Sequence, residues 1–251
     1  MAARVTYIGH ATVLVEIDGV RLLTDPVLRR RVGPLWRHAA LPDPRLAEGV
    51  DAVLISHLHH DHADVPSLRR LSRTVPVLAA PGSRDFLARL GFGDVRELAP
   101  GDSSNVGGVR VTATEANHPS GGRRFERASR AIGFELAGQR RIYFAGDTDL
   151  FDGMEAIGGD KLDLALLPIW GWGTNIGAGH LDPERAARAA ALLSANLVVP
   201  IHWGTLYPLG LARLRPGPLR APPRRLATWM RELAPHSELR VLVPGEATSL
   251  A

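Results

Sequence analysis

A run of six residues in the first quarter of the chain carries the clearest signal for chemistry. Residues 57–62 read HLHHDH and follow the apolar run 52–55, which has the length and composition of a buried strand. Imidazole and carboxylate groups bind borderline divalent metals such as zinc, and four of them in one loop are too many for a single tetrahedral ion that also takes ligands from elsewhere. The pattern therefore predicts two metal ions side by side. The candidate ligands in the run are His57, His59, Asp61 and His62.

Three later residues are candidates for the remaining ligands. His118, Asp147 and His202 each follow shortly after a stretch with the pattern of a strand, although each one alone is equally compatible with a polar residue at a strand end. Gly146 precedes Asp147 and lets the backbone approach a metal closely. Together with the HLHHDH run, these residues complete two ligand sets that Asp147 bridges. The sets are His57, His59 and His118 for one metal, and Asp61, His62 and His202 for the other.

The elements expected around these ligands form two strand-rich halves, each with helices, which predicts two packed sheets covered by outer helices. The clearest helix is expected over 183–195, with Asp182 as its N-cap. The segments 29–49 and 206–223 are rich in Arg, Pro and Gly and are expected to be long loops. Residues 240–243 have the pattern of a final strand that closes the chain.

The chain resembles the metallo-β-lactamase fold superfamily, because these ligands match the superfamily's motif in the same order along the sequence. The resemblance covers essentially the whole chain and implies an α/β fold, a four-layer αββα sandwich, with 1–251 as a single domain and the metals at one edge of the sheets. Two departures from well-known members of the superfamily limit the activities that we expect. The chain has no cysteine where the common zinc β-lactamases place one, so antibiotic hydrolysis is not expected. His59 stands where flavodiiron oxidoreductases typically carry Glu, which favours hydrolysis over redox chemistry.

A narrower resemblance lies in five short segments. They look like the branch that contains N-acylphosphatidylethanolamine phospholipase D and ascorbate-6-phosphate lactonase. In that branch the histidine matching His180 lies beside the metals and helps to bind or polarise the substrate; the alternative for His180 is a role in capping the helix that follows Asp182. Members of the branch cleave different bonds, so the substrate stays open. The segments are 9–12 (GHAT), 23–26 (LTDP), 146–148 (GDT), 180–184 (HLDPE) and 201–205 (IHWGT).

The expected function is that of a binuclear metal-dependent hydrolase. A hydroxide shared by two divalent ions would attack a small, anionic ester, lactone or phosphodiester. Asp61 or Asp147 would accept its proton, and His180 would stabilise the developing oxyanion or assist the leaving group. Zn²⁺ is the first expectation, with Mn²⁺ or Fe²⁺ as alternatives. The competing functions are a nuclease of the same fold and a non-catalytic metal-binding or sensor protein.

Several other residues are expected to contact substrate. Arg123 and Arg124 follow His118 and can receive a phosphate or carboxylate, unless they belong to a solvated loop. Trp172 is expected to contact the substrate. Trp170, Trp172 and Trp203 lie near His180 and His202 in the sequence, and they are expected either to wall an apolar pocket or to pack in the core.

Two polar residues near the N-terminus are expected to orient ligands. His10 and Asp25 are better suited to hold metal-binding histidines than to bind metal, although both are compatible with ordinary polar groups at strand ends.

Composition limits the class of protein. Without cysteine the chain has neither a disulfide framework nor a thiolate nucleophile. The net charge is +4, and Lys161 is the only lysine; basic residues spread along the chain do not predict a nucleic-acid partner. No run is long and apolar enough to span a bilayer, and the first residues lack the apolar core of a signal peptide. We therefore expect a cytoplasmic enzyme with a small-molecule substrate; the oligomeric state is not predicted.

Overall fold

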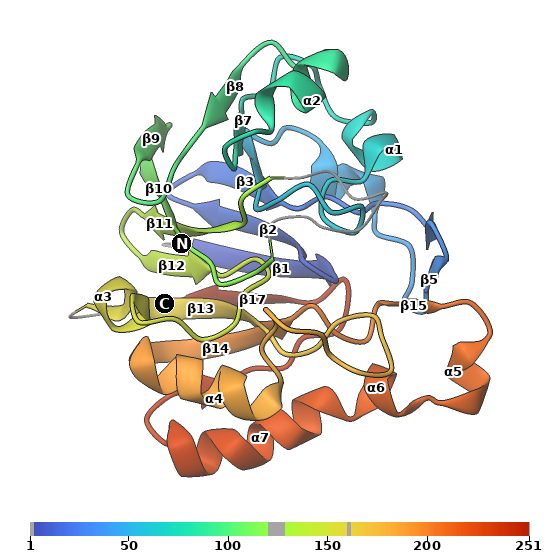
Figure 1. The fold of residues 1–251 in the computed structure, drawn as a ribbon. Helices are drawn as coiled ribbons and strands as arrows, with labels where there is room; N and C mark the ends of the chain where they lie inside the picture. The colour runs from blue at the N-terminus through green and yellow to red at the C-terminus, as the bar shows by residue number, and fades with distance from the viewer. Residues whose placement is uncertain (1–2, 120–128, 160–161, 251) are drawn as a thin grey trace.

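Two large sheets pack face to face and carry helices on their outer faces (Figure 1). The structure, a computed structural model, describes residues 3–119, 129–159 and 162–250. The four-layer αββα sandwich predicted from the resemblance is confirmed. The first sheet, in spatial order, consists of β17 (Ala247–Leu250), β1 (Ala3–Gly9), β2 (Thr12–Ile17), β3 (Val20–Thr24), β6 (Ala52–Ile55), β7 (Val77–Ala79) and β8 (Val95–Glu97).

Both sheets contain parallel and antiparallel strands, and the second is built like the first. Its parallel strands are β12, β13, β14 and β16, and antiparallel strands continue it on the other side of β12. In spatial order the sheet consists of β16 (Glu238–Leu239), β14 (Ala195–Ile201), β13 (Leu162–Pro168), β12 (Arg141–Phe144), β11 (Ile132–Ala137), β10 (Val109–Glu115) and β9 (Ser103–Val106).

Apolar residues fill both faces of the central strands. On β6, Leu54 faces the core between the two sheets, whereas Val53 and Ile55 face the outer helices. This alternation explains why the run is continuously apolar, because a parallel strand covered on both sides has no polar face. The outer helices are α1 (Val65–Leu68) and α2 (Arg84–Arg89) on the first sheet, and α3 (Met154–Gly158), α4 (Pro183–Leu192) and α7 (Pro222–Leu233) on the second.

The directions of the strands bring the candidate ligands to one edge. In the first sheet β1, β3 and β6 run the same way, because β2 pairs antiparallel with both β1 and β3. In the second sheet β10, β12 and β14 share one direction for the same reason. The residues that follow these six strands include His10, Asp25, the 57–62 run, His118, Asp147 and His202.

The two segments expected to be long loops contain regular structure. Within 29–49 lie β4 (Arg31–Val32), β5 (Leu35–Arg37) and a short 3₁₀ helix, Pro44–Ala47; within 206–223 lie β15 (Leu206–Pro208), α5 (Leu211–Leu214) and α6 (Gly217–Arg220). The strands β15, β5 and β4 form a small third sheet over a buried cluster of Val27, Val32, Leu35 and Leu206. Local sequence did not predict this sheet because its strands are short and come from distant parts of the chain.

Two further expectations need correction. The helix expected over 183–195 ends at Leu192, since Ser194 has a left-handed backbone and β14 begins at Ala195. The expected strand over 240–243 is wrong: these residues are not in a strand, and the chain pairs instead through β16 and β17. In the described part of the chain, no helix has the length and apolar character needed to cross a membrane.

Candidate metal centre

Three histidines meet at one end of the site. We call His57, His59 and His118 the His57 group. Nε2 of His57 lies 2.9 Å from Nδ1 of His59, and Nε2 of His118 lies 3.3 Å from the same Nδ1. The three nitrogens converge on one point, which is the arrangement expected of three ligands of a single ion.

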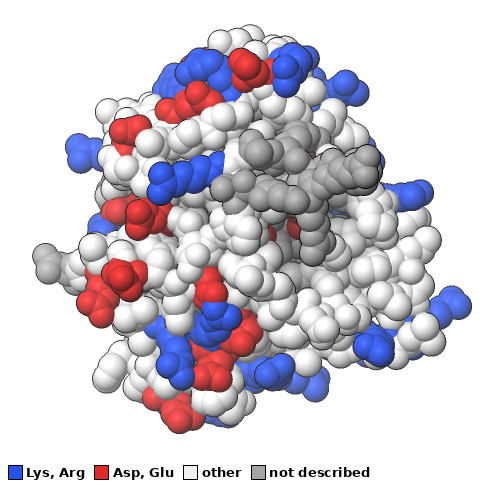
Figure 2. Space-filling view, viewed as in Figure 1, with Lys and Arg blue, Asp and Glu red and all other residues white. Residues whose placement is uncertain are grey.

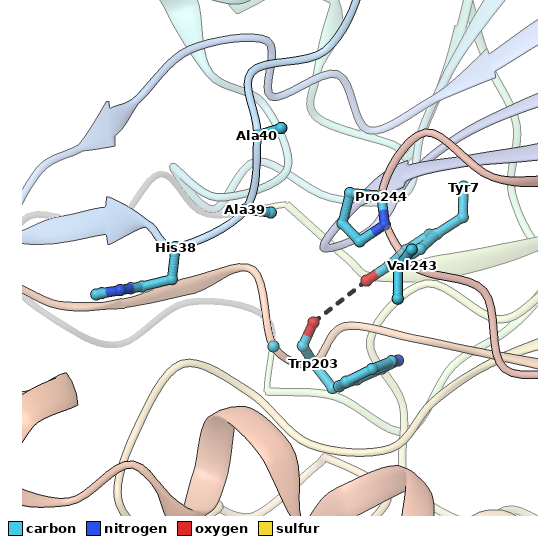
Figure 3. A pocket seen from close by; sticks show the side chains of 8 residues that line it. Tyr7, His38, Ala39, Ala40, Trp203, Val243 and Pro244 are labelled. Carbon is cyan, nitrogen blue, oxygen red and sulfur yellow. Dashed lines mark hydrogen bonds between the residues drawn. The ribbon is translucent and has the colours of Figure 1, made fainter.

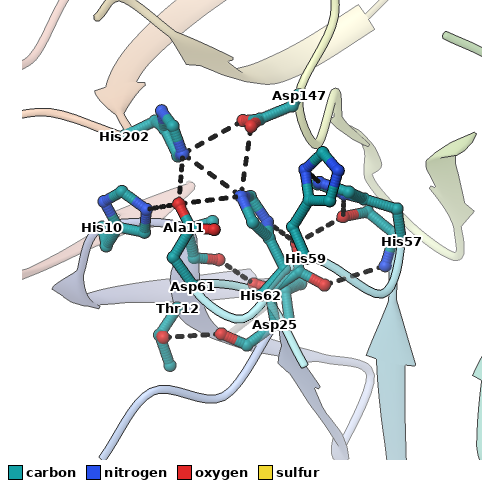
Figure 4. A network of polar contacts seen from close by, with 12 residues as sticks. His10, Ala11, Thr12, Asp25, His57, His59, Asp61, His62, Asp147 and His202 are labelled. Atoms are coloured by element: carbon teal, nitrogen blue, oxygen red, sulfur yellow. Dashed lines mark hydrogen bonds and ion pairs between the residues drawn. The ribbon is translucent and has the colours of Figure 1, made fainter. Parts of the chain in front are cut away.

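A second set lies beside it. We call Asp61, His62 and His202 the His62 group. Nε2 of His62 lies 3.2 Å from Nε2 of His202, and Oδ2 of Asp61 lies 3.7 Å from each of these nitrogens. All three side chains are buried. His10 contacts the His62 group without being one of its three members, because its Nε2–H donates to Oδ2 of Asp61 at 2.9 Å (Figure 4).

Asp147 lies between the two groups. Its Oδ2 is 3.2 Å from Nε2 of His62, and its Oδ1 is 3.2 Å from Nε2 of His202. One of its oxygens also falls in a compact group with His57, which connects it to the other histidine set. Gly146 makes this position possible: its φ is +61°, and a Cβ there would lie 2.8 Å from Cβ of Ser56. The predicted bridging position of Asp147 is therefore compatible with the geometry.

A buried hydrogen-bond chain orients two of the histidines. Asp25, fully buried, accepts a hydrogen bond from Nδ1 of His62 at 2.7 Å and another from the Ser56 hydroxyl at 2.6 Å. The same hydroxyl oxygen lies 3.0 Å from Nδ1 of His57 and can accept its proton. Asp25 thus orients one histidine of each group: it contacts His62 directly and His57 through Ser56 (Figure 4).

Backbone carbonyls orient two more histidines. Nδ1 of His202 lies 2.9 Å from the carbonyl oxygen of Trp170, and Nδ1 of His118 lies 2.8 Å from that of Gly179. A carbonyl oxygen only accepts, so each Nδ1 carries the proton and each Nε2 presents a lone pair to the site. Gly179 itself has φ +75°, which brings its backbone close to His118.

This donor set fits bound cations. The Nε2 lone pair of His202 faces Nε2 of His62 across 3.2 Å, so this arrangement needs a positive charge between the two nitrogens, supplied either by a proton on His62 or by a bound cation in its place. The buried Oδ1 of Asp147 has no hydrogen-bond donor among the described residues. A divalent ion in each group would satisfy these electron pairs, since neutral imidazole and carboxylate are common metal ligands.

The pKa values of the site follow from burial and charge. Burial keeps the pKa of His57 well below its usual value and lowers that of His118 to about 4, so both stay neutral as metal binding requires. Burial also acts to lower the pKa of His62, but the charges of Asp147 and Asp61 outweigh it and hold that pKa well above the ordinary value. The site therefore attracts a positive charge at the His62 group.

Strained backbone clusters at the same place. His10, Asp25 and His202 adopt left-handed φ angles of 59°, 33° and 61°, a conformation that is uncommon outside glycine. Hydrogen bonds hold two of them, because the backbone N–H of His202 donates to the carbonyl of His10, and the N–H of His10 donates to the Thr205 hydroxyl. Such strain persists only where the surroundings fix it, and it is typical of functional sites.

His180 lies at the open side of the centre. Its Nε2 is 3.4 Å from Oδ2 of Asp147, and its side chain is 22% exposed, so it is accessible to a ligand. Burial lowers its pKa, but the hydrogen bond and charge of Asp147 outweigh this and raise it overall. The alternative role as a helix cap is not observed, because the Asp182 side chain caps α4 by accepting from the N–H of Arg185.

The other expected substrate contacts have mixed outcomes. Arg123 and Arg124 lie outside the described residues. Trp172 is half-buried and packs against the cluster beneath the small sheet, and Trp203 packs against the core under α4 and α7. Trp203 also lines a depression of about 340 Å³ with Tyr7, whose hydroxyl donates to the Trp203 carbonyl at 3.2 Å (Figure 3).

Two residues that support the site were missed from the sequence. Ser56 links Asp25 to His57, and its position directly before the HLHHDH run was the available signal. Arg37 is 1% exposed and donates to the carbonyls of Ile8, Val27 and Arg29, which fixes the backbone leading to His10. Nothing in its local sequence distinguishes Arg37 from the other arginines.

The fold and this centre define a metal-dependent hydrolase of the metallo-β-lactamase type. The model of the β-lactamase superfamily domain matches residues 20–203, and the chain belongs to this family. A UPF0173 metal-dependent hydrolase of Rubrobacter xylanophilus is 34% identical over 97% of this chain and 95% of its own length. An N-acyl-phosphatidylethanolamine-hydrolyzing phospholipase D of Caenorhabditis elegans is 31% identical over 82% of this chain and 64% of its own length.

Solved structures agree with this assignment. The metallo hydrolase Igni18 of Ignicoccus hospitalis superposes with a TM-score of 0.74 at 28% identity, covering 98% of this chain and 97% of its own. The suspected superfamily and branch are thus confirmed.

Proposed function

We propose that this chain is a binuclear metal-dependent hydrolase in a single domain, 1–251. The His57 group would bind one ion and the His62 group the other, with Asp147 between them. The observation that carries the proposal is the convergence of oriented Nε2 lone pairs and unneutralised carboxylate oxygens on two adjacent points. Zn²⁺ is the first candidate, and Mn²⁺ or Fe²⁺ accept the same ligands.

The chemistry would be divided between the ions and the chain. Bound divalent ions activate water as a nucleophile and stabilise the negative charge that develops in hydrolysis. Asp61 or Asp147 would accept the proton of that water, which is supported by the distances of 3.7 and 3.2 Å from their Oδ2 atoms to Nε2 of His62. His180, exposed at the rim with a raised pKa, would donate a hydrogen bond to the developing oxyanion or a proton to the leaving group.

The substrate we propose is a small anionic ester, lactone or phosphodiester. The phospholipase D name of one relative supports a phosphodiester, but its chain extends well beyond the matched region. Arg123 and Arg124 stay candidates for binding the anionic group, and Trp172 for contacting its apolar part.

The test is metal analysis combined with turnover. We expect two metals per chain and chelator-sensitive hydrolysis of bis(p-nitrophenyl) phosphate or of a member of a lactone panel. Asp147→Asn should lower both the metal content and the turnover, whereas His236→Ala, which removes an exposed histidine far along the chain, should change neither. Protein that stays metal-free in excess Zn²⁺ and Mn²⁺ would refute the proposal. Two metals without turnover on any substrate would favour the non-catalytic alternative, and cleavage of nucleic acid alone would favour the nuclease.

A further inference from the structure

Two leucines project from the corner formed by the small sheet and α5. Leu209 is 67% exposed and Leu214 is 78% exposed, the highest values among the large apolar side chains that the structure describes. Leu209 precedes α5 by two residues and Leu214 is its last residue, and the Leu209 N–H donates to the carbonyl of Pro34 in the turn between β4 and β5. Two exposed leucines are ordinary for a protein surface by themselves, so what they could contact depends on the charged residues around them.

Arginines surround these leucines. Arg213 and Arg215 lie in the same segment. Arg31 begins β4, the strand that β5 joins to β15, and Arg30 precedes it; all four arginines are exposed. None lies within ion-pair distance of a carboxylate in the ranges 3–119, 129–159 and 162–250. We call the six residues the basic corner; they are Arg30, Arg31, Leu209, Arg213, Leu214 and Arg215.

The corner is firmly attached to the fold. Arg31 donates from Nε to the carbonyl of Gly33 at 2.8 Å, and the guanidinium of Arg30 lies 5.9 Å from the centre of the Trp36 ring. The buried Tyr207 hydroxyl donates to the carbonyl of Arg215 at 3.1 Å. The arrangement is therefore built by tertiary contacts and does not depend on an isolated flexible loop.

The two segments that form the corner contain no acidic residue. Neither 26–42 nor 185–231 contains an Asp or Glu, although the whole chain has 26 of them. In Figure 2 the red side chains gather on the left and top of the visible face, whereas the lower right, over α5 and α6, carries blue ones only. The net charge of +4 thus conceals a local concentration of positive charge that the small sheet assembles from two distant segments.

We propose that the basic corner docks this protein on an anionic lipid bilayer. The leucines would enter the boundary between headgroups and acyl chains, and the arginines would bind lipid phosphates around them. Both contributions are needed, because two leucines bury too little apolar surface for stable binding, and electrostatic attraction alone is screened by salt.

Two other kinds of partner, a nucleic acid and a second copy of this chain, fit the corner less well. A nucleic acid would attract the arginines, but it could receive the leucines only by unstacking a base step, which costs about a few kcal/mol. A second copy of the chain related by a two-fold axis would place arginines against arginines. A bilayer with anionic headgroups satisfies both the charge and the apolar side chains.

The small sheet that carries part of the corner packs against a residue that is close in sequence to the metal centre. The cluster beneath the small sheet also contacts Trp172, and the Trp170 carbonyl two residues earlier orients His202. The inference goes beyond the proposed hydrolase function and does not depend on it, since it concerns binding and not turnover.

Vesicle binding by the full-length, metal-loaded protein tests the proposal. We expect co-sedimentation with vesicles of phosphatidylglycerol and phosphatidylcholine, little with phosphatidylcholine alone, and loss of binding at high salt. Arg213→Ser with Arg215→Ser should weaken binding by about fivefold for each arginine. Leu209→Ser with Leu214→Ser should weaken it at least as strongly, and Leu209→Trp with Leu214→Trp should strengthen it.

A matched control distinguishes docking at the basic corner from an attraction that depends only on the net charge of the protein. Arg89→Ser with Arg110→Ser removes the same charge from exposed positions on α2 and β10, away from the corner in Figure 1, and should leave binding nearly unchanged. Thermal melting verifies that each variant folds. Absence of binding to anionic vesicles, or equal losses in the control and corner variants, would overturn the proposal. So would tight binding of a DNA duplex that persists in the leucine variant, since the corner would then bind nucleic acid.

Discussion

Asp25 and His62 form a fully buried pair in which Oδ2 of the carboxylate lies 2.7 Å from Nδ1 of the imidazole. Because the same oxygen also accepts from the Ser56 hydroxyl, this single carboxylate fixes the orientation of a histidine in each proposed metal group. Asp25 lies at the end of β3 with a left-handed backbone, so its position depends on the packed loop around it and not on its local preference.

Asp25→Asn should weaken metal binding without changing any proposed ligand. Oδ2 of Asp25 accepts from His62 and from the Ser56 hydroxyl, and Oδ1 accepts from the Ser56 backbone N–H. An amide has only one oxygen, so in either orientation its NH₂ group faces a donor. We expect the affinity for metal to fall by about 10- to 100-fold, the usual effect of removing a partner that orients a ligand. Competition with a chromophoric chelator measures this, and unchanged affinity would show that Asp25 does not orient the histidines.

His10→Asn should affect mainly the His62 group. Asn tolerates the left-handed backbone at this position, but its shorter side chain cannot keep the 2.9 Å contact with Oδ2 of Asp61. We expect loss of one metal of two at limiting metal concentration, and recovery of turnover when excess metal is added. If turnover stays low with both metals bound, His10 has a role beyond holding Asp61.

His180→Ala should separate catalysis from metal binding. The residue faces Asp147 from the open rim, and its Nδ1 faces backbone carbonyls of its own loop. We expect kcat to fall by about 10²- to 10⁴-fold, as for loss of a general acid or an oxyanion donor, with metal content unchanged. Loss of metal in this variant would instead assign His180 to the metal centre.

The pH should control metal affinity through the His62 group. Burial opposes but does not overcome the carboxylates that raise the pKa of His62, so the metal-free protein carries a proton there at neutral pH. That proton stabilises the metal-free fold fully below the unfolded pKa, and the contribution is lost as pH rises through the folded pKa. Metal must displace it, so affinity should rise with pH by up to about tenfold per unit for each proton released.

Calorimetry in buffers of different ionisation enthalpy measures this release. We expect proton release between pH 6 and 7 and a larger increase in Tm on adding Zn²⁺ at pH 8 than at pH 6. Affinity that is constant over this range would mean that His62 is already neutral without metal.

The sequence alone predicted the sandwich and the set of residues that meets at its edge. The HLHHDH run follows a strand of the first sheet that is apolar on both faces. His118, Asp147 and His202 each follow a strand of the second sheet, and these three strands share one direction. Such signals are local: strand periodicity and ligand type can be read within a few residues. The same local reading failed for 240–243 and for the short strands of the small sheet, whose pairing depends on partners far away in the chain.

Only the tertiary structure decided how the ligands are held and what surrounds them. Asp25 reaches His62 across 37 residues, and the His202 imidazole depends on the carbonyl of Trp170, contacts that no spacing rule specifies. The basic corner has the same origin, because β5 pairs with β15 and so joins two acid-free segments that lie far apart in sequence. Composition and spacing determine which groups are available to the fold, whereas long-range packing determines their orientation, their burial and therefore their charge.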